Sequence, residues 1–119
     1  MTTETPNGPN SLCVIWSAAD RDVALELVFM YTINSKIRGW WDNVRLVIWG
    51  PSARLLAEDE ELLDHIYALQ KEGVEVQACK RCADDLGVAE PLEKAGIEVI
   101  YMGVPLTDMI KDGWKVLTF

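Results

Sequence analysis

The sequence has little cysteine, a single histidine and no long apolar run, and each shortage excludes a class of protein. No apolar stretch approaches the about 20 residues that a membrane-spanning helix needs. Residues 1–10 are polar and have neither the basic nor the apolar part of a secretory signal. Structural zinc usually takes its four ligands from two close pairs, whereas the chain offers one close pair of cysteines, the separate Cys13 and the lone His65. We therefore expect a protein of the cytoplasm, with no membrane partner and no metal.

Basic residues are also in the minority. The chain has 11 Lys and Arg against 19 Asp and Glu, which gives a net charge of −8. Proteins bind nucleic acid largely by neutralising its phosphates with Lys and Arg, so neither DNA nor RNA is an expected partner. The signatures G-x-G-x-x-G and G-x-x-x-x-G-K-[ST], which hold the phosphates of nucleotides, are missing too. We therefore predict no cofactor.

The sequence does have a regular alternation of short apolar runs and helix-like stretches. Residues 1–10 contain two prolines and a glycine and are predicted to form a flexible arm, followed by a single domain over residues 11–119. The pattern predicts strands over residues 12–16, 44–49, 74–79, 97–102 and 114–119, with helices over 21–36, 52–71, 80–86 and 91–95 and a short one ending near 111. This alternation predicts a three-layer α/β/α fold with a five-stranded, mostly parallel sheet, of flavodoxin-like architecture.

One predicted helix is apolar on almost every side. Residues 23–33 contain Glu26 as their only charge, whereas the surface helix of a monomer normally has a polar face. Extra apolar surface of this kind predicts contact with another copy of the chain. The alternative is that Tyr31 and the neighbouring Trp40 and Trp41 cover the helix within one chain.

Candidate functional residues follow the predicted strands, because open α/β sheets collect ligands and chemistry beyond the carboxyl ends of their strands. The candidate pocket residues at these ends are Ser17, Asp20, Trp49, Gly50, Ser52 and Gly103. Neither serine lies in a G-x-S-x-G motif, so both are interpreted as loop or helix-cap residues rather than as nucleophiles.

Two cysteines follow the third predicted strand, with two cations between them. Cys79 lies at the end of the strand and Cys82 lies one helical turn later. Lys80, Arg81 and the start of the helix all favour a thiolate, which predicts a lowered pKa for Cys79. A thiolate suits disulfide exchange, or the acceptance and transfer of sulfane sulfur, with Cys82 as a resolving thiol.

The alternative is that these cysteines are small buried residues, as free cysteines most often are. The alternation of side chains along the strand places Cys79 with Glu75 and Gln77, on the more polar face, which favours a functional role. Cys13 lies inside the first predicted strand and is expected in the core.

Four segments, in order, carry a family resemblance: CVIWSAADRD at 13–22, IWGPSARLL at 48–56, VEVQACKRCADDLGV at 74–88 and DGWKVLTF at 112–119. Together they resemble the DsrE-like family, which includes the DsrE/DsrF/DsrH and TusB/TusC/TusD sulfur-relay proteins and the YchN-like proteins. The resemblance implies trimers or hexamers, and a cysteine after the third strand, Cys79 by position, that accepts sulfur as a persulfide. Cys82 matches a second cysteine of YchN-like members, whereas Lys80 replaces a glycine that is common there.

The leading hypothesis is a cytoplasmic sulfur-relay or sulfurtransferase-like protein that carries sulfane sulfur on Cys79, with sulfur donor and acceptor proteins as partners. One alternative is an oligomeric module that binds a small ligand or regulates a partner while its cysteines stay passive. Another is a redox protein that uses the C-x-x-C pair as a dithiol.

Overall fold

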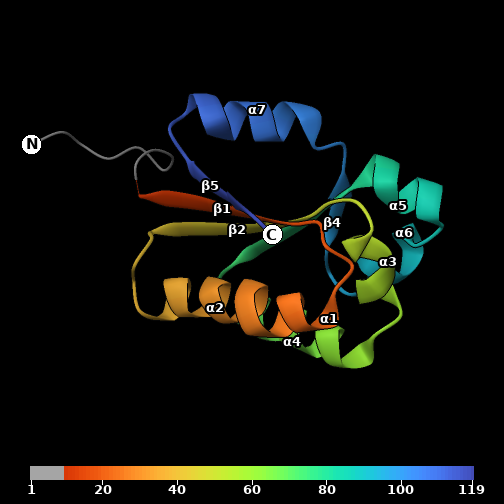
Figure 1. Ribbon diagram of the computed structural model, residues 1–119. Helices are drawn as coiled ribbons and strands as arrows, with labels where there is room; N and C mark the ends of the chain where they lie inside the picture. Colours follow the sequence, from red (N-terminus) through yellow and green to blue (C-terminus); the bar gives the residue numbers. More distant parts are fainter. Residues whose placement is uncertain (1–9) are drawn as a thin grey trace, which may run out of the picture.

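A five-stranded parallel sheet forms the centre of the protein in the computed structural model, which describes residues 10–119 (Figure 1). Its strands are β1 (Ser11–Trp16), β2 (Asn43–Ile48), β3 (Glu75–Cys79), β4 (Glu98–Ile100) and β5 (Lys115–Thr118). They lie in the order β4-β3-β2-β1-β5, and every neighbouring pair runs parallel. The predicted fold class is therefore confirmed, whereas the predicted arm lies outside the described residues except for Asn10.

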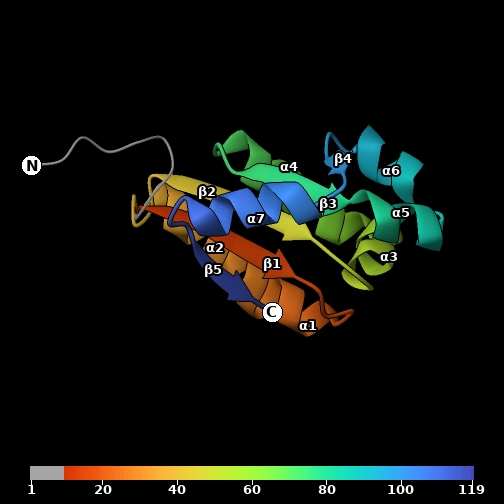
Figure 2. The ribbon, with the colours of Figure 1, turned by 90° about the horizontal axis from the view of Figure 1, so that it is seen from above.

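Helices cover the two faces of the sheet unequally, as Figures 1 and 2 show. The helical segments are α1 (Arg21–Val23), the π-helical η1 (Ala24–Val28), α2 (Phe29–Ile37), α3 (Ser52–Ala57), α4 (Glu60–Lys71), α5 (Lys80–Leu86), α6 (Ala89–Lys94) and α7 (Gly103–Lys111). The chain steps along the sheet from β1 to β4, so right-handed crossovers place α2 and α4 on one face. The connection from β4 to β5 returns the other way, so within residues 10–119 α7 is the helix that covers the opposite face.

Local sequence explains where the structure differs from the predicted helix bounds. The helix predicted over 52–71 is two helices, because Asp59 is extended and its side chain accepts the N–H of Leu62 as the cap of α4. The helix predicted from Pro91 begins two residues earlier, at Ala89. Pro91 fits in its first turn because the N–H groups of that turn have no helical hydrogen bond to lose. Within residues 10–119, none of the helices is both long enough and apolar enough to cross a bilayer.

Two apolar clusters pack on the two faces of the sheet. The larger one, here called the main core, joins the sheet to α2 and α4 and includes Leu12, Val14, Leu46 and Ile66, all of them buried. The smaller one, here called the α7 cluster, lies under α7. Its buried members are Cys13, Val47, Cys79, Met102, Met109 and Trp114. The core position predicted for Cys13 is therefore confirmed.

The apolar helix predicted over 23–33 keeps part of its surface open. Trp41 Nε1 donates to the Tyr31 hydroxyl over 3.2 Å, and the Trp40 ring lies 5.8 Å from the Tyr31 ring. Leu27 and Met30 nevertheless remain 48% and 51% exposed. Cover from within the chain is thus only partial.

Candidate functional site

Cys79 marks the transition from strand to helix. It is the last residue of β3 and the extended cap residue of α5. The predicted sharing of a face with Gln77 is confirmed, but that face is not polar at this point, because both side chains are buried and Cys79 is only 5% exposed. Met102 and Met109 belong to the same cluster, so the thiol lies in an apolar and sulfur-rich surrounding.

Cys82 lies one turn further along α5 and is half-buried. Burial, followed by a hydrogen bond with the Cys79 thiol, raises the pKa of Cys82, while a hydrogen bond from the Gly50 backbone opposes this effect. Both cysteines are free thiols. The structure therefore brings the two thiols into direct contact at the carboxyl edge of the sheet, as the C-x-x-C spacing predicted.

The two cations between the cysteines are engaged elsewhere. Lys80 Nζ lies 3.2 Å from Asp84 Oδ2, and Arg81 Nε lies 3.1 Å from Asp85 Oδ2, each pair one turn apart on α5. The hydrogen bond to the Asp84 carboxylate, followed by the attraction between the two charges, raises the pKa of Lys80. Carboxylates this close offset most of the positive charge, so Lys80 and Arg81 offer Cys79 less electrostatic help than the sequence alone indicates.

A hollow of about 440 Å³ opens beside α5 and is lined by Gly50, Pro51, Cys82, Asp85 and Leu86. Gly50 has a φ of +85°, a left-handed conformation that favours glycine, and this turn after β2 aims its backbone at Cys82. Cys82 is the thiol on the wall of this hollow, here called the α5 pocket. Cys79 does not line this pocket and belongs to the α7 cluster, against which Cys82 also packs.

The polar residues predicted near this edge hold loops together. The Ser17 hydroxyl donates to the Phe119 carbonyl over 3.0 Å, and the buried Ser52 hydroxyl donates to the Trp16 carbonyl over 2.6 Å. The Asp20 side chain caps α1 by accepting the N–H three residues on, over 3.0 Å. These contacts match the loop and cap roles that the sequence indicates for the serines.

The remaining predicted residues divide between the two sides of the edge. Gly50 lines the α5 pocket, whereas Trp49 packs half-buried against the α7 cluster and Gly103 is exposed at the start of α7. Sequence reasoning did not single out Asp85 or Leu86, although their spacing from Cys82 places all three on one side of a helix.

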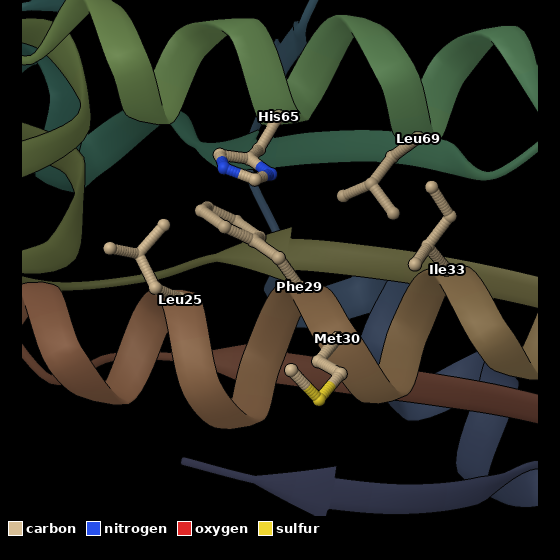
Figure 3. A pocket seen from close by; sticks show the side chains of 6 residues that line it. All are labelled: Leu25, Phe29, Met30, Ile33, His65 and Leu69. Atoms are coloured by element: carbon tan, nitrogen blue, oxygen red, sulfur yellow. The ribbon is translucent and has the colours of Figure 1, made fainter.

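A second hollow of about 410 Å³ lies between the η1–α2 stretch and α4, on the face opposite the α7 cluster (Figure 3). Its lining residues are Leu25, Phe29, Met30, Ile33, His65 and Leu69. The His65 ring stacks on Phe29, with centroids 5.3 Å apart and an angle of 14° between the planes. The rest of the lining is apolar, so His65 has the role of a packing residue here. Across residues 10–119, no three side chains of His, Cys, Asp or Glu come together as metal ligands.

Comparison with known proteins places this geometry in a family. A conserved protein of unknown function from Bacteroides thetaiotaomicron is 34% identical, with a TM-score of 0.91 over 98% of this chain and 100% of that one. The YchN protein from E. coli and a protein of unknown function from Methanobacterium thermoautotrophicum are 20% and 18% identical. Each has a TM-score of 0.69 over 92% of this chain and 97% of its own, a likeness of fold. No curated protein matches significantly. The model of the DsrE/DsrF-like family matches residues 4–119, and the chain therefore belongs to that family.

Proposed function

We propose that this protein is a cytoplasmic sulfur carrier that holds sulfane sulfur as a persulfide on Cys79, with Cys82 as its partner thiol. The observation that carries the proposal is the contact between two free thiols at the carboxyl edge of the sheet, beside an open pocket. The DsrE/DsrF-like family is associated with sulfur relay, which supports the same function. Separate donor and acceptor proteins are the partners that such a carrier needs.

The surroundings of Cys79 suit storage of a reactive sulfur. Cys79 is buried beside β4 in the α7 cluster, which also contains Met102, and a persulfide kept out of water is shielded from oxidants and from stray thiols. The raised pKa of Cys82 keeps its proton in place at neutral pH. Cys82 can then donate a hydrogen bond to the sulfur that Cys79 carries, which stabilises the persulfide anion.

The test is incubation of the reduced protein with a low-molecular-weight persulfide, followed by mass spectrometry of the intact chain and its peptides. We expect sulfur on Cys79 in the natural sequence and loss of stable loading in Cys79→Ser. Cys13 serves as an internal control, because it is fully buried and burial raises its pKa to about 11. Full loading of Cys79→Ser would contradict the proposed site, and an unloaded natural protein would contradict the function.

We also propose that the protein works as a homo-oligomer, a trimer or a hexamer. Leu27, Met30 and Trp40 stay about half exposed, and they line a groove of about 720 Å³ between α2 and β5 together with Leu117. A second copy that covers this groove would remove apolar surface from water. Sedimentation should give an assembly, and Met30→Glu should shift it toward smaller species; a monomeric natural protein would count against the proposal.

The contact between the thiols also favours a second candidate, a dithiol redox protein. Two thiols in hydrogen-bond contact need little movement to form a disulfide. Titration with glutathione disulfide would then give a reversible Cys79–Cys82 couple. Failure to form that bond under mild oxidant would exclude the redox candidate and leave the sulfur carrier standing.

A further inference from the structure

The two thiols differ sharply in how an incoming molecule can reach them. Cys82 forms part of the wall of the α5 pocket, together with Gly50, Pro51 and Leu86. Cys79 is 5% exposed, is not among the residues that line the pocket, and belongs to the α7 cluster, against which Cys82 also packs. A sulfur donor too large to enter the α7 cluster therefore meets the sulfur of Cys82 first.

We propose that sulfur enters the protein through Cys82 and is then passed inward to Cys79. This order rests on the proposed function, and it assigns the two cysteines unequal tasks: Cys82 is the entry thiol and Cys79 is the storage thiol. The ligand class that the entry site takes is a persulfide at the end of a slim arm. A small thiol persulfide and the persulfide of an exposed protein cysteine share this end group.

Both steps are exchanges in which sulfur moves without net oxidation. In the first, the Cys82 thiolate attacks the outer sulfur of the donor R–S–SH, the donor S–S bond breaks, and the donor leaves as a thiolate that takes up the proton lost by Cys82. In the second, the Cys79 thiolate attacks the outer sulfur of the Cys82 persulfide. The S–S bond on Cys82 breaks, a persulfide forms on Cys79, and the proton of Cys79 passes to the Cys82 thiolate. No oxidant or reductant is consumed.

The pocket supplies what the first step needs. Burial raises the pKa of Cys82 overall, so the attacking thiolate is the minor form at neutral pH, and the hydrogen bond from the Gly50 backbone is the contact that opposes this rise. The hydrogen bond between the two thiols gives the short path that the second step needs. Pro51 and Leu86 make most of the remaining wall apolar, so the pocket can accept an uncharged arm without desolvating many polar groups.

The experiment follows the first seconds of loading. The reduced protein is mixed with glutathione persulfide or, in a second arm, with a persulfidated carrier protein, then quenched with an alkylating agent at increasing times. Trypsin cuts after Lys80 and Arg81, so Cys79 and Cys82 are released on different peptides and their persulfides are counted separately. The comparison of the two arms identifies which source of persulfide the entry site accepts.

We expect persulfide on Cys82 to rise first and to decline as persulfide on Cys79 appears. In Cys79→Ser it should accumulate on Cys82, and in Cys82→Ser the loading of Cys79 should slow at least about tenfold. Loading of Cys79 in Cys82→Ser at the natural rate, or simultaneous loading of both cysteines, would overturn the inference. If neither cysteine loads in the natural protein, the proposed function itself fails, so the two failures are distinguishable.

A second pair of variants tests the route while both thiols remain. Asp85→Trp places a large ring at the wall of the α5 pocket, whereas Asp84→Trp places it one residue away, off the pocket lining. Each removes one exposed ion pair within α5, so the two are matched in their cost to the helix. The first should slow loading of Cys82 and the second should not; equal rates in both would overturn entry through this pocket.

Discussion

The two faces of the sheet differ in what they bury and in how thickly they are covered. On one face, α2 and α4 press against the main core, whose buried members are mostly aliphatic, such as Leu46 and Ile66. On the other face, α7 is the one helix of residues 10–119 that covers a smaller cluster, which contains two cysteines and two methionines (Figure 2). We infer that the first face supplies most of the stability, whereas the second gives up some packing to surround a reactive thiol.

A charged side chain lies beside the α7 cluster. Arg45 projects toward the α7 side, where its guanidinium lies 5.0 Å from the centre of the Trp114 ring and 3.0 Å from Glu75 Oε1. A cation beside a sulfur-rich cluster is tolerated because the carboxylate and the ring accompany it, and it also acts on the pKa of Cys13.

The largest expected effect on the free energy of unfolding comes from truncating a side chain in the main core. Ile66 on α4 is fully buried, and Ile66→Ala should lower the free energy of unfolding by about 2–5 kcal/mol, since the lost contacts leave a cavity. Cys79 lies across the sheet, so its rate of alkylation in native conditions should stay unchanged. Denaturant unfolding and alkylation with iodoacetamide measure the two quantities. A large rise in the alkylation rate would show that the two faces are not independent.

The next largest expected effect is a loss of folding stability at alkaline pH, which arises from a buried thiol on the α7 side. Burial raises the pKa of Cys13 from 9.0 to about 11, against the lowering effect of Arg45. The folded chain therefore keeps this proton up to a higher pH than the unfolded chain does. The resulting stability is fully present below about pH 9 and is lost as pH rises toward about 11, by about 2–3 kcal/mol for a shift of this size.

Denaturant unfolding at about pH 8 and about pH 11 measures this loss in the natural protein and in Cys13→Ala. The variant loses packing and should be less stable at the lower pH, yet its stability should fall less between the two. Equal falls would mean that Cys13 contributes nothing to the alkaline decline, and that the α7 cluster is more open to water than its burial indicates.

The sequence predicted the sheet, its parallel strands and the placing of Cys79 and Cys82 at one edge, because these follow from local periodicity and from the rule about strand ends. It did not predict the burial of Cys79. Met102, which belongs to the same buried cluster, comes from a segment more than 20 residues away, as the numbering itself shows. Which face α7 would cover depends on the return crossover from β4 to β5, and this follows only once the strand order is known.

The two cations beside the thiol pair are offset by ion pairs that the sequence spacing does encode. Asp84 and Asp85 stand four positions after Lys80 and Arg81, the distance at which helix side chains meet. The α5 pocket could be predicted only in part, because its wall combines the turn after β2 with α5. Those segments lie side by side through the packing of α3 against α5, a contact that no periodicity within either segment encodes.

The smallest expected effect on stability comes from truncating a side chain of α7. It tests the difference between the two faces directly, because the same change should also alter how fast a buried thiol reacts. Met109→Ala removes a side chain that is 3% exposed in the α7 cluster, and we expect a loss of about 2 kcal/mol, at the low end for such truncations. A single outer helix can settle inward more easily than α2 and α4 can. Met109 Sδ lies 3.3 Å from Arg45, the strand neighbour of Cys13, so any space that remains should admit water and reagent to Cys13, whose alkylation should speed up in native conditions.

Ile110→Ala is the matched control, because Ile110 is the next residue of α7 and is 56% exposed. It should change neither the free energy of unfolding nor the alkylation rate appreciably. If Met109→Ala left Cys13 as slow to react as in the natural protein, α7 would not be the barrier that protects this thiol.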